Sequence, residues 1–279
     1  MTDTVPATGA APVDGFPYAL VATDLDGTLL RTDHSVSPRA REALAEVVRR
    51  GATHVVVTGR GAAVTEPVLR ELGYEGLAVC GQGAQLYHAG ERRLLTSLTL
   101  DRGVARAALT RVQEELGTLM VSASRDGLAG EVVQEPDFRT LGPLAVRVVP
   151  REELLDEPVT KLYVQHPRLS DEVLAKSCQK LVGDLVTVVL SGPDIVELLP
   201  LGLTKASGMS LVTRRLGLRG ARSIAFGDMP NDVPLLGWAS HGVAMGGAHQ
   251  ELLSVADEVT ATNDEDGVAL VLERLLSEA

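Results

Sequence analysis

Residues Tyr18–Leu30 read YALVATDLDGTLL, and this stretch decides the fold. Its first part, Tyr18–Thr23, is an apolar run of strand length, and Asp24 and Asp26 follow directly. A strand that is apolar on both faces is typical of a parallel sheet covered by helices on both sides. Because ligands bind beyond the carboxyl ends of such strands, the two acids are candidate site residues. Gly27 permits a tight turn that folds the chain back toward the strand end.

The same alternation of apolar runs and amphipathic stretches continues in two parts of the chain. Strands are expected at Thr53–Val57, Leu77–Cys80, Ser223–Phe226 and Gly242–Met245, and helices at Pro38–Arg50, Ala62–Leu72, Lys205–Leu216, Val233–Trp238 and Glu265–Leu276. This order of elements predicts an α/β fold with a Rossmann-like parallel-sheet core.

A stretch of different character, residues 87–199, interrupts this alternation. It contains expected helices at 103–116 and 170–181 and expected strands at 119–122, 144–149, 161–165, 185–190 and 195–199. Such a set predicts a separate α+β unit, inserted where the ends of the host chain lie close together. We therefore predict a core of residues 16–86 and 200–279, an inserted cap domain of residues 87–199, and a loose tail at residues 1–15.

Composition excludes several classes of function. The net charge of −11, without a dense block of Lys or Arg, argues against a nucleic-acid partner. No apolar stretch approaches the roughly 20 residues that span a bilayer, so no membrane partner is expected. The two cysteines, Cys80 and Cys178, lie in apolar stretches and suit a reducing cytoplasm better than a disulfide framework.

Three further segments place polar residues where strands end or helices begin. Thr58 and Gly59 lie between a strand and a helix, where a hydroxyl and backbone N–H groups form an anion site, although an ordinary turn has the same pattern. Lys205 begins a helix, and an isolated lysine is usually a surface residue. Asp228, Asn231 and Asp232 (in GDMPND) again follow a strand. A turn does not require three polar side chains at that spacing, so this segment is expected to bind a ligand.

The run DLDGTLL closely resembles the first motif of the haloacid dehalogenase superfamily of phosphohydrolases. The resemblance implies that Asp24 attacks phosphorus, and that Asp26 protonates the leaving oxygen and then activates water. Relatives without the second acid typically perform other chemistry, so Asp26 favours phosphate transfer to water. The resemblance also implies Mg²⁺, bound by Asp24, Asp228 and the backbone carbonyl of Asp26. Magnesium takes oxygen ligands and would offset the repulsion between a carboxylate and a phosphate.

The other three segments resemble the remaining motifs of this family, in the family's order. The resemblance implies phosphate contacts from Thr58, Gly59, Lys205 and Asn231. Lys205 would also bridge the nucleophile and the phosphate, and Asp232 would orient water on the metal.

The C-terminal part looks like the Cof-type subgroup, which carries a large cap between its second and third motifs. The matching segments are Gly242–Gly246 (GVAMG), Ala256–Thr260 (ADEVT) and Glu265–Val268 (EDGV). Relatives usually have Asn where this chain has Gln82, often have Asn at Gly247, and commonly have a Lys near residues 252–255. These departures concern the substrate preference and the contacts between cap and core.

The resemblance predicts a Mg²⁺-dependent phosphatase that hydrolyses phosphate monoesters of small metabolites through a phospho-aspartate. A large cap favours small substrates, with sugar phosphates first and flavin mononucleotide or pyridoxal phosphate as alternatives. A phosphomutase acting on sugar phosphates is the alternative enzyme. A non-catalytic protein that binds a phosphorylated metabolite is the alternative outside enzymes.

Overall fold

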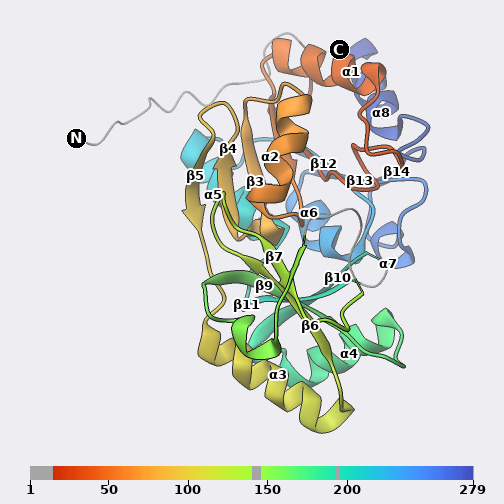
Figure 1. The fold of residues 1–279 in the computed structure, drawn as a ribbon. Helices are drawn as coiled ribbons and strands as arrows, with labels where there is room; N and C mark the ends of the chain where they lie inside the picture. Colours follow the sequence, from red (N-terminus) through yellow and green to blue (C-terminus); the bar gives the residue numbers. More distant parts are fainter. Residues whose placement is uncertain (1–14, 140–145, 193–194, 279) are drawn as a thin grey trace.

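The computed structural model describes residues 15–139, 146–192 and 195–278, and it contains two β-sheets (Figure 1). The first sheet has the strand order β14-β13-β12-β1-β2-β3-β4-β5. Its strands are β1 (Leu20–Thr23), β2 (Thr53–Val57), β3 (Leu77–Cys80), β4 (Gln85–His88), β5 (Arg93–Ser97), β12 (Ser223–Gly227), β13 (His241–Ala244) and β14 (Glu258–Val259). The strands from β14 to β3 run parallel, and β4 and β5 add an antiparallel edge. This sheet confirms the predicted α/β fold.

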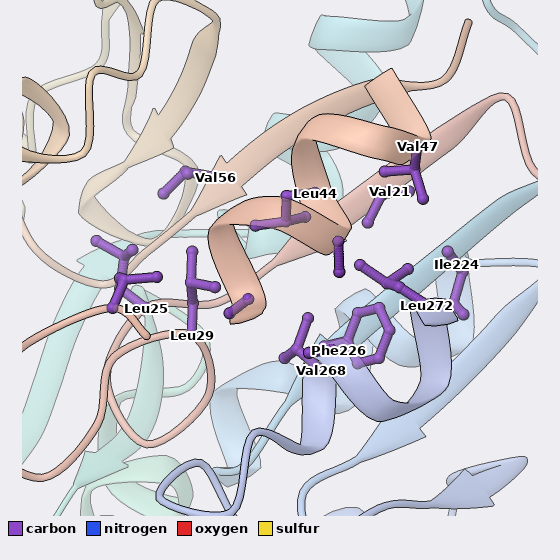
Figure 2. Close-up of a cluster of buried hydrophobic side chains, with 14 of the residues drawn as sticks. Val21, Leu25, Leu29, Leu44, Val47, Val56, Ile224, Phe226, Val268 and Leu272 are labelled. Carbon is purple, nitrogen blue, oxygen red and sulfur yellow. The ribbon is translucent and has the colours of Figure 1, made fainter. Parts of the chain in front are cut away.

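Helices cover both faces of the first sheet because its strands are apolar on both sides. The helices are α1 (Pro38–Arg49), α2 (Ala62–Glu71), α5 (Lys205–Leu216), α6 (Val233–Trp238), α7 (Gln250–Leu253) and α8 (Gly267–Ser277). Side chains of α1, α2 and α8 pack with Val21 in one buried cluster, whereas α5, α6 and α7 pack with Leu20 and Ala22 in another. Figure 2 shows the first cluster, in which α1 and α8 meet Val21, Ile224 and Phe226.

The second sheet has the order β10-β11-β9-β6-β7-β8 and lies between the first sheet and helices α3 and α4 (Figure 1). Its elements are α3 (Arg102–Leu116), β6 (Met120–Arg125), β7 (Val132–Gln134), β8 (Val146–Val148), β9 (Val159–Gln165), α4 (Asp171–Val182), β10 (Val186–Gly192) and β11 (Ile195–Pro200). The helices α3 and α4 bury one face of this sheet in a core of its own. The other face is therefore free to meet the first sheet.

The start of the predicted insert at residue 87 is wrong. Residue 87 lies within β4, and both β4 and β5 hydrogen-bond within the first sheet. The strand β4 reads QLYH, so its two apolar side chains, Leu86 and Tyr87, lie between polar residues and do not form the continuous apolar run that identified the central strands. The sequence also did not predict β7, β14 and α7, which are all short.

Two predictions fall partly or wholly on residues that the structure does not describe. The loose tail at 1–15 and the first two residues of the expected strand at 144–149 lie outside the described residues, apart from residue 15. Cys80 and Cys178 are both buried free thiols, in keeping with the small apolar role expected of them. Within the described ranges, no helix has both the length and the apolar character needed to cross a bilayer.

His54 on β2 makes the stability of the core depend on pH. Its Nε2 lies 2.9 Å from Thr23 Oγ1, and its ring meets Tyr74 edge-on. Burial lowers the pKa of His54 from 6.5 to about 4, whereas the unfolded chain binds a proton near 6.5. The free energy of unfolding should therefore fall by roughly 3 kcal/mol as the pH drops through this interval. Urea titrations across the interval measure the effect, and His54→Gln should remove it. An equal pH dependence in that variant would contradict the assignment.

Candidate active site

The carboxyl ends of three neighbouring strands bring the predicted motifs together. Thr23, the last residue of β1, pairs with Val56 of β2 on one side and with Phe226 of β12 on the other. Asp24 follows β1 directly and is 5% exposed, and its backbone N–H donates to the Phe226 carbonyl at 3.1 Å. The loop after each of these strands therefore reaches the same edge of the first sheet.

Gly27 allows the first loop to approach the loop after β12. It has a φ of +72°, and a Cβ atom at this position would overlap the Asp228 carboxylate. The next residue, Thr28, donates from Oγ1 to Asp228 Oδ1 at 3.3 Å. Only glycine combines this conformation with this close approach, so the turn expected at Gly27 has a structural cause.

Lys205 joins the first and last acidic motifs. It is the first residue of α5, and a capping box formed by Thr204 and Ser207 fixes this end of the helix. Its Nζ donates to Asp24 Oδ1 at 2.7 Å and to Asp232 Oδ1 at 2.6 Å, and all three side chains are buried. Burial opposes the charged ammonium, but the two carboxylates outweigh it and raise the pKa of Lys205. A permanent cation therefore lies beside the predicted nucleophile.

The acidic cluster has the composition of a divalent-cation site. Carboxylate oxygens of Asp24, Asp228 and Asp232 lie within 4.8 Å of one another. Burial, together with the neighbouring acids, raises the pKa of Asp24 well above its usual value and that of Asp228 to about 7. Three carboxyl groups surround the single ammonium group of Lys205, so Lys205 alone does not neutralise the cluster, and a divalent cation would do so. The residues therefore fit a metal ion with oxygen ligands.

Asp232 differs from the other two acids because protein donors occupy both of its oxygens. Oδ1 accepts from Lys205, and Oδ2 accepts from the backbone N–H groups of Asp228 at 3.1 Å and Met229 at 3.2 Å. It therefore fixes the loop that carries Asp228. This geometry favours an orienting role over direct metal binding.

Asp26 forms a bidentate ion pair with Arg60 that the sequence analysis did not predict. Arg60 Nε lies 2.7 Å from Asp26 Oδ2, and Arg60 Nη2 lies 2.5 Å from Oδ1. The Asp26 side chain is 49% exposed and faces the same cavity as Asp24. Arg60 directly follows Thr58 and Gly59 in the chain, so its position next to a predicted phosphate-binding motif could have indicated that it lies at the site.

The loop after β2 offers a hydroxyl beside this pair. Thr58 is buried, and its Oγ1 accepts a hydrogen bond from the Arg60 backbone N–H at 3.1 Å. The hydroxyl hydrogen therefore stays available to donate. A Cβ atom on Gly59 would lie 2.6 Å from Gln82 Nε2, so glycine lets this loop pass close to the Gln82 side chain.

Asn231 joins a chain of buried amides. Its Nδ2 donates to Gln82 Oε1 at 3.0 Å, and its buried Oδ1 has no hydrogen-bond partner among the described residues. Gln82 has a φ of +61° and donates from Nε2 to Glu197 Oε2 at 3.0 Å. The residue at position 82, one of the departures from the family pattern, thus links the core to the second sheet.

A cavity of about 230 Å³ opens over these residues. The first-sheet part contributes Asp24, Asp26, His34, Arg60, Lys205, Asp228 and Asn231, and the second sheet contributes Ser124, Val132, Lys161, Tyr163, Ile195 and Glu197. The second sheet therefore closes the site. Sequence reasoning missed Lys161 and Glu197. Both are charged residues that alternate, in β9 and β11, with buried side chains of the second sheet's own core, and that alternation was the available signal.

A family model for haloacid dehalogenase-like hydrolases matches residues 21–272, which is nearly the whole described chain. The chain belongs to this family. The predicted superfamily and the predicted class of enzyme, a hydrolase, are both confirmed.

Relatives of similar length agree with a phosphatase within the haloacid dehalogenase-like family. An HMP-PP phosphatase of Serratia proteamaculans is 28% identical over 93% of this chain and 96% of its own length. A 5-amino-6-(5-phospho-D-ribitylamino)uracil phosphatase of Bacillus subtilis is 28% identical over 94% and 98% of the two chains. A haloacid dehalogenase-like hydrolase from B. subtilis of known structure is 25% identical, with a TM-score of 0.78 over 92% of this chain and 99% of its own.

Proposed function

We propose that this haloacid dehalogenase-like hydrolase is a Mg²⁺-dependent phosphatase for small phosphorylated metabolites, acting through a phospho-aspartate on Asp24. One observation carries the proposal. The Asp24 carboxylate faces the cavity, is held by Lys205 at 2.7 Å and shares an acidic cluster with Asp228. A buried carboxylate beside a cation and an open cavity suits a nucleophile for an anionic substrate.

The residues divide the reaction into two steps. In the first step, Asp24 forms a bond to phosphorus, the ester P–O bond breaks, and Asp26 gives its proton to the leaving oxygen. In the second step, Asp26 takes a proton from water, which attacks phosphorus and releases phosphate from Asp24. Thr58, Gly59, Lys205 and Asn231 bind the phosphoryl oxygens throughout. Asp24, Asp228 and the backbone carbonyl of Asp26 would hold Mg²⁺, which would supply positive charge that reduces the repulsion between carboxylate and phosphate.

Sugar phosphates are the substrate class that we favour. The cavity of about 230 Å³ suits a small leaving group, and it mixes hydroxyl and charged side chains with apolar walls. The name of the B. subtilis relative specifies a phosphate on a ribityl chain, which also bears hydroxyl groups. Both observations support a polyhydroxylated leaving group.

Phosphate release from a panel of phosphorylated metabolites, with and without Mg²⁺, tests this function. We expect release that stops when a chelator removes the metal and returns when Mg²⁺ is added. Asp228→Asn should require a higher Mg²⁺ concentration, because it removes one charged ligand. Isomerised sugar phosphate without free phosphate would indicate a phosphomutase. Absence of turnover with every compound would contradict an enzyme.

Asp26→Asn should slow turnover by roughly 10²–10⁴-fold, because an amide cannot exchange the proton that both steps need. The variant keeps the shape of the side chain, so the fold should persist. Initial rates at saturating substrate measure the effect. Asp156→Asn, an equal change at an exposed position away from the cavity, is the matched control. A rate equal to that of the control would remove Asp26 from the mechanism.

A further inference from the structure

The second sheet places a buried ion pair at the cavity. Lys161 of β9 and Glu197 of β11 are 1% and 2% exposed, and Lys161 Nζ lies 2.5 Å from Glu197 Oε1. Lys161 Nζ also donates to the Gly59 carbonyl at 2.7 Å, and Glu197 Oε2 accepts from Gln82. A buried pair is costly to maintain unless its geometry is good and its other atoms are hydrogen-bonded. Here both conditions hold, and the pair lies directly beside the phosphate-binding loop.

Every lysine and arginine lining the cavity, among the described residues, already has a carboxylate partner. Arg60 pairs with Asp26, Lys161 with Glu197, and Lys205 with both Asp24 and Asp232. In the proposed function, the reacting phosphoryl group binds at the acidic cluster, next to the Mg²⁺ that the cluster would hold. A second anionic group on the substrate would find no unpaired lysine or arginine, and it would lie near the Glu197 carboxylate. Such a group would lose its hydration without compensation.

The same pair can serve a hydroxyl group. Lys161 has three N–H donors: Glu197 and Gly59 take two of them, and the ammonium group also lies over the Tyr163 ring, 4.6 Å from its centroid. Tyr163 lines the cavity and brings its own hydroxyl group, so the donor to a substrate comes from this Lys161–Tyr163 pair. A carboxylate accepts about four hydrogen bonds, so Glu197 keeps accepting capacity beyond Lys161 and Gln82. Ser124 adds a hydroxyl, while Val132 and Ile195 provide apolar surface for C–H groups. This combination of donor, acceptor and apolar wall matches a sugar or polyol.

We propose that Lys161 and Glu197 determine specificity for the leaving group. They select an uncharged leaving group that bears hydroxyls, and they exclude one that carries a second phosphate or a carboxylate. This inference rests on the proposed phosphatase function. Glu197 performs both tasks, because it accepts from a hydroxyl and cancels the positive charge that would otherwise attract a second anion.

The test compares three substrates: p-nitrophenyl phosphate, glucose 6-phosphate and glucose 1,6-bisphosphate. We expect wild-type enzyme to prefer the monophosphate over the bisphosphate in kcat/KM. Glu197→Gln leaves the Lys161 charge uncompensated, so it should shift this preference toward the bisphosphate by about tenfold or more. Lys180→Gln, at an exposed position on α4, changes one charge without touching the cavity and should keep the wild-type preference.

A double variant separates specificity from folding. Lys161→Met with Glu197→Gln removes both charges at similar volume, so neither charge is left buried alone. It should lose about tenfold or more of the preference for glucose 6-phosphate over p-nitrophenyl phosphate, without gaining activity on the bisphosphate. Circular dichroism and thermal melting confirm that each variant is folded.

Two results would overturn the specificity assignment. One is a wild-type enzyme that hydrolyses monophosphate and bisphosphate equally well. The other is a folded Glu197→Gln enzyme with an unchanged ratio between them. A different result would contradict the proposed phosphatase function itself: wild-type protein with Mg²⁺ would release no phosphate from any of the three compounds. The specificity proposal would then be contradicted as well.

Discussion

Asp24→Asn should reduce phosphate release by about 10⁴-fold or more, because an amide cannot attack phosphorus. The protein should still fold, since Lys205 keeps its bond to Asp232 at 2.6 Å. Burial raises the pKa of Asp24, so the folded protein disfavours its charged form more than the unfolded chain does. Stability contributed by such a group declines as the pH rises. At neutral pH the uncharged variant should therefore unfold at a urea concentration no lower than that of the wild type.

Two measurements check this result. Turnover assays give the rate, and mass spectrometry of acid-quenched reactions detects a phosphorylated peptide containing residue 24. We expect that peptide with wild-type enzyme and with the Asp156→Asn control, but not with Asp24→Asn. Turnover at the control rate in Asp24→Asn would place the nucleophile elsewhere. A folded but inactive variant would support both the assignment and the mechanism.

Lys205→Met should damage stability as well as activity. The change leaves the buried carboxylates of Asp24 and Asp232 without their shared partner, and loss of one member of a buried ion pair costs roughly 3–5 kcal/mol. The metal-free variant should therefore unfold at a much lower urea concentration than the wild type. Added Mg²⁺ should restore part of the loss, because a cation that binds only the folded state stabilises it by an amount that grows with the logarithm of the cation concentration above its Kd.

Lys180→Met is the matched control for this prediction, because Lys180 is exposed on α4. The control should unfold within about 0.5 kcal/mol of the wild type, as expected for a surface change. Turnover of Lys205→Met should be lower than that of the control at every Mg²⁺ concentration, since the phosphate also loses a cation. Equal stability of the two variants would show that the acids near residue 205 do not depend on its ammonium group.

The central strands and the motif residues could be predicted from the sequence for a physical reason. The motifs of Asp24, Thr58 and Asp228 directly follow apolar runs, and parallel strands place such positions at one edge of a sheet. Lys205 instead begins a helix that follows the second sheet, so only the family resemblance predicts its meeting with Asp24 and Asp232, and the distances agree with that resemblance. The position of Asp228 near Asp24 agrees as well. Binding of phosphate by Thr58, Gly59 and Asn231 stays a prediction.

Contacts between the two sheets could not be predicted in the same way. Gln82 and Glu197 are 115 residues apart in the chain, and Lys161 and Glu197 are 36 apart. The segment VTKLYVQ of β9 has the character of a strand, and its alternation places Lys161 on the face opposite Leu162 and Val164, but it does not show what that face meets. The division into domains 16–86 with 200–279 and 87–199 also needs revision at its first boundary, because β4 and β5 complete the first sheet.

The position of β1 in the middle of the first sheet has a consequence for how this enzyme loses activity. β1 lies between β2 and β12, and its pairing with β12 brings Asp24, near the beginning of the chain, within reach of the same ion as Asp228, near its end. In a partly denatured molecule in which β1 has separated from β12, Asp24 no longer lies near Asp228, so the acidic cluster is lost completely and not in part. Enzymatic rate should thus serve as a gauge of intact molecules during denaturation, falling in step with hydrogen exchange at the amides of these two strands.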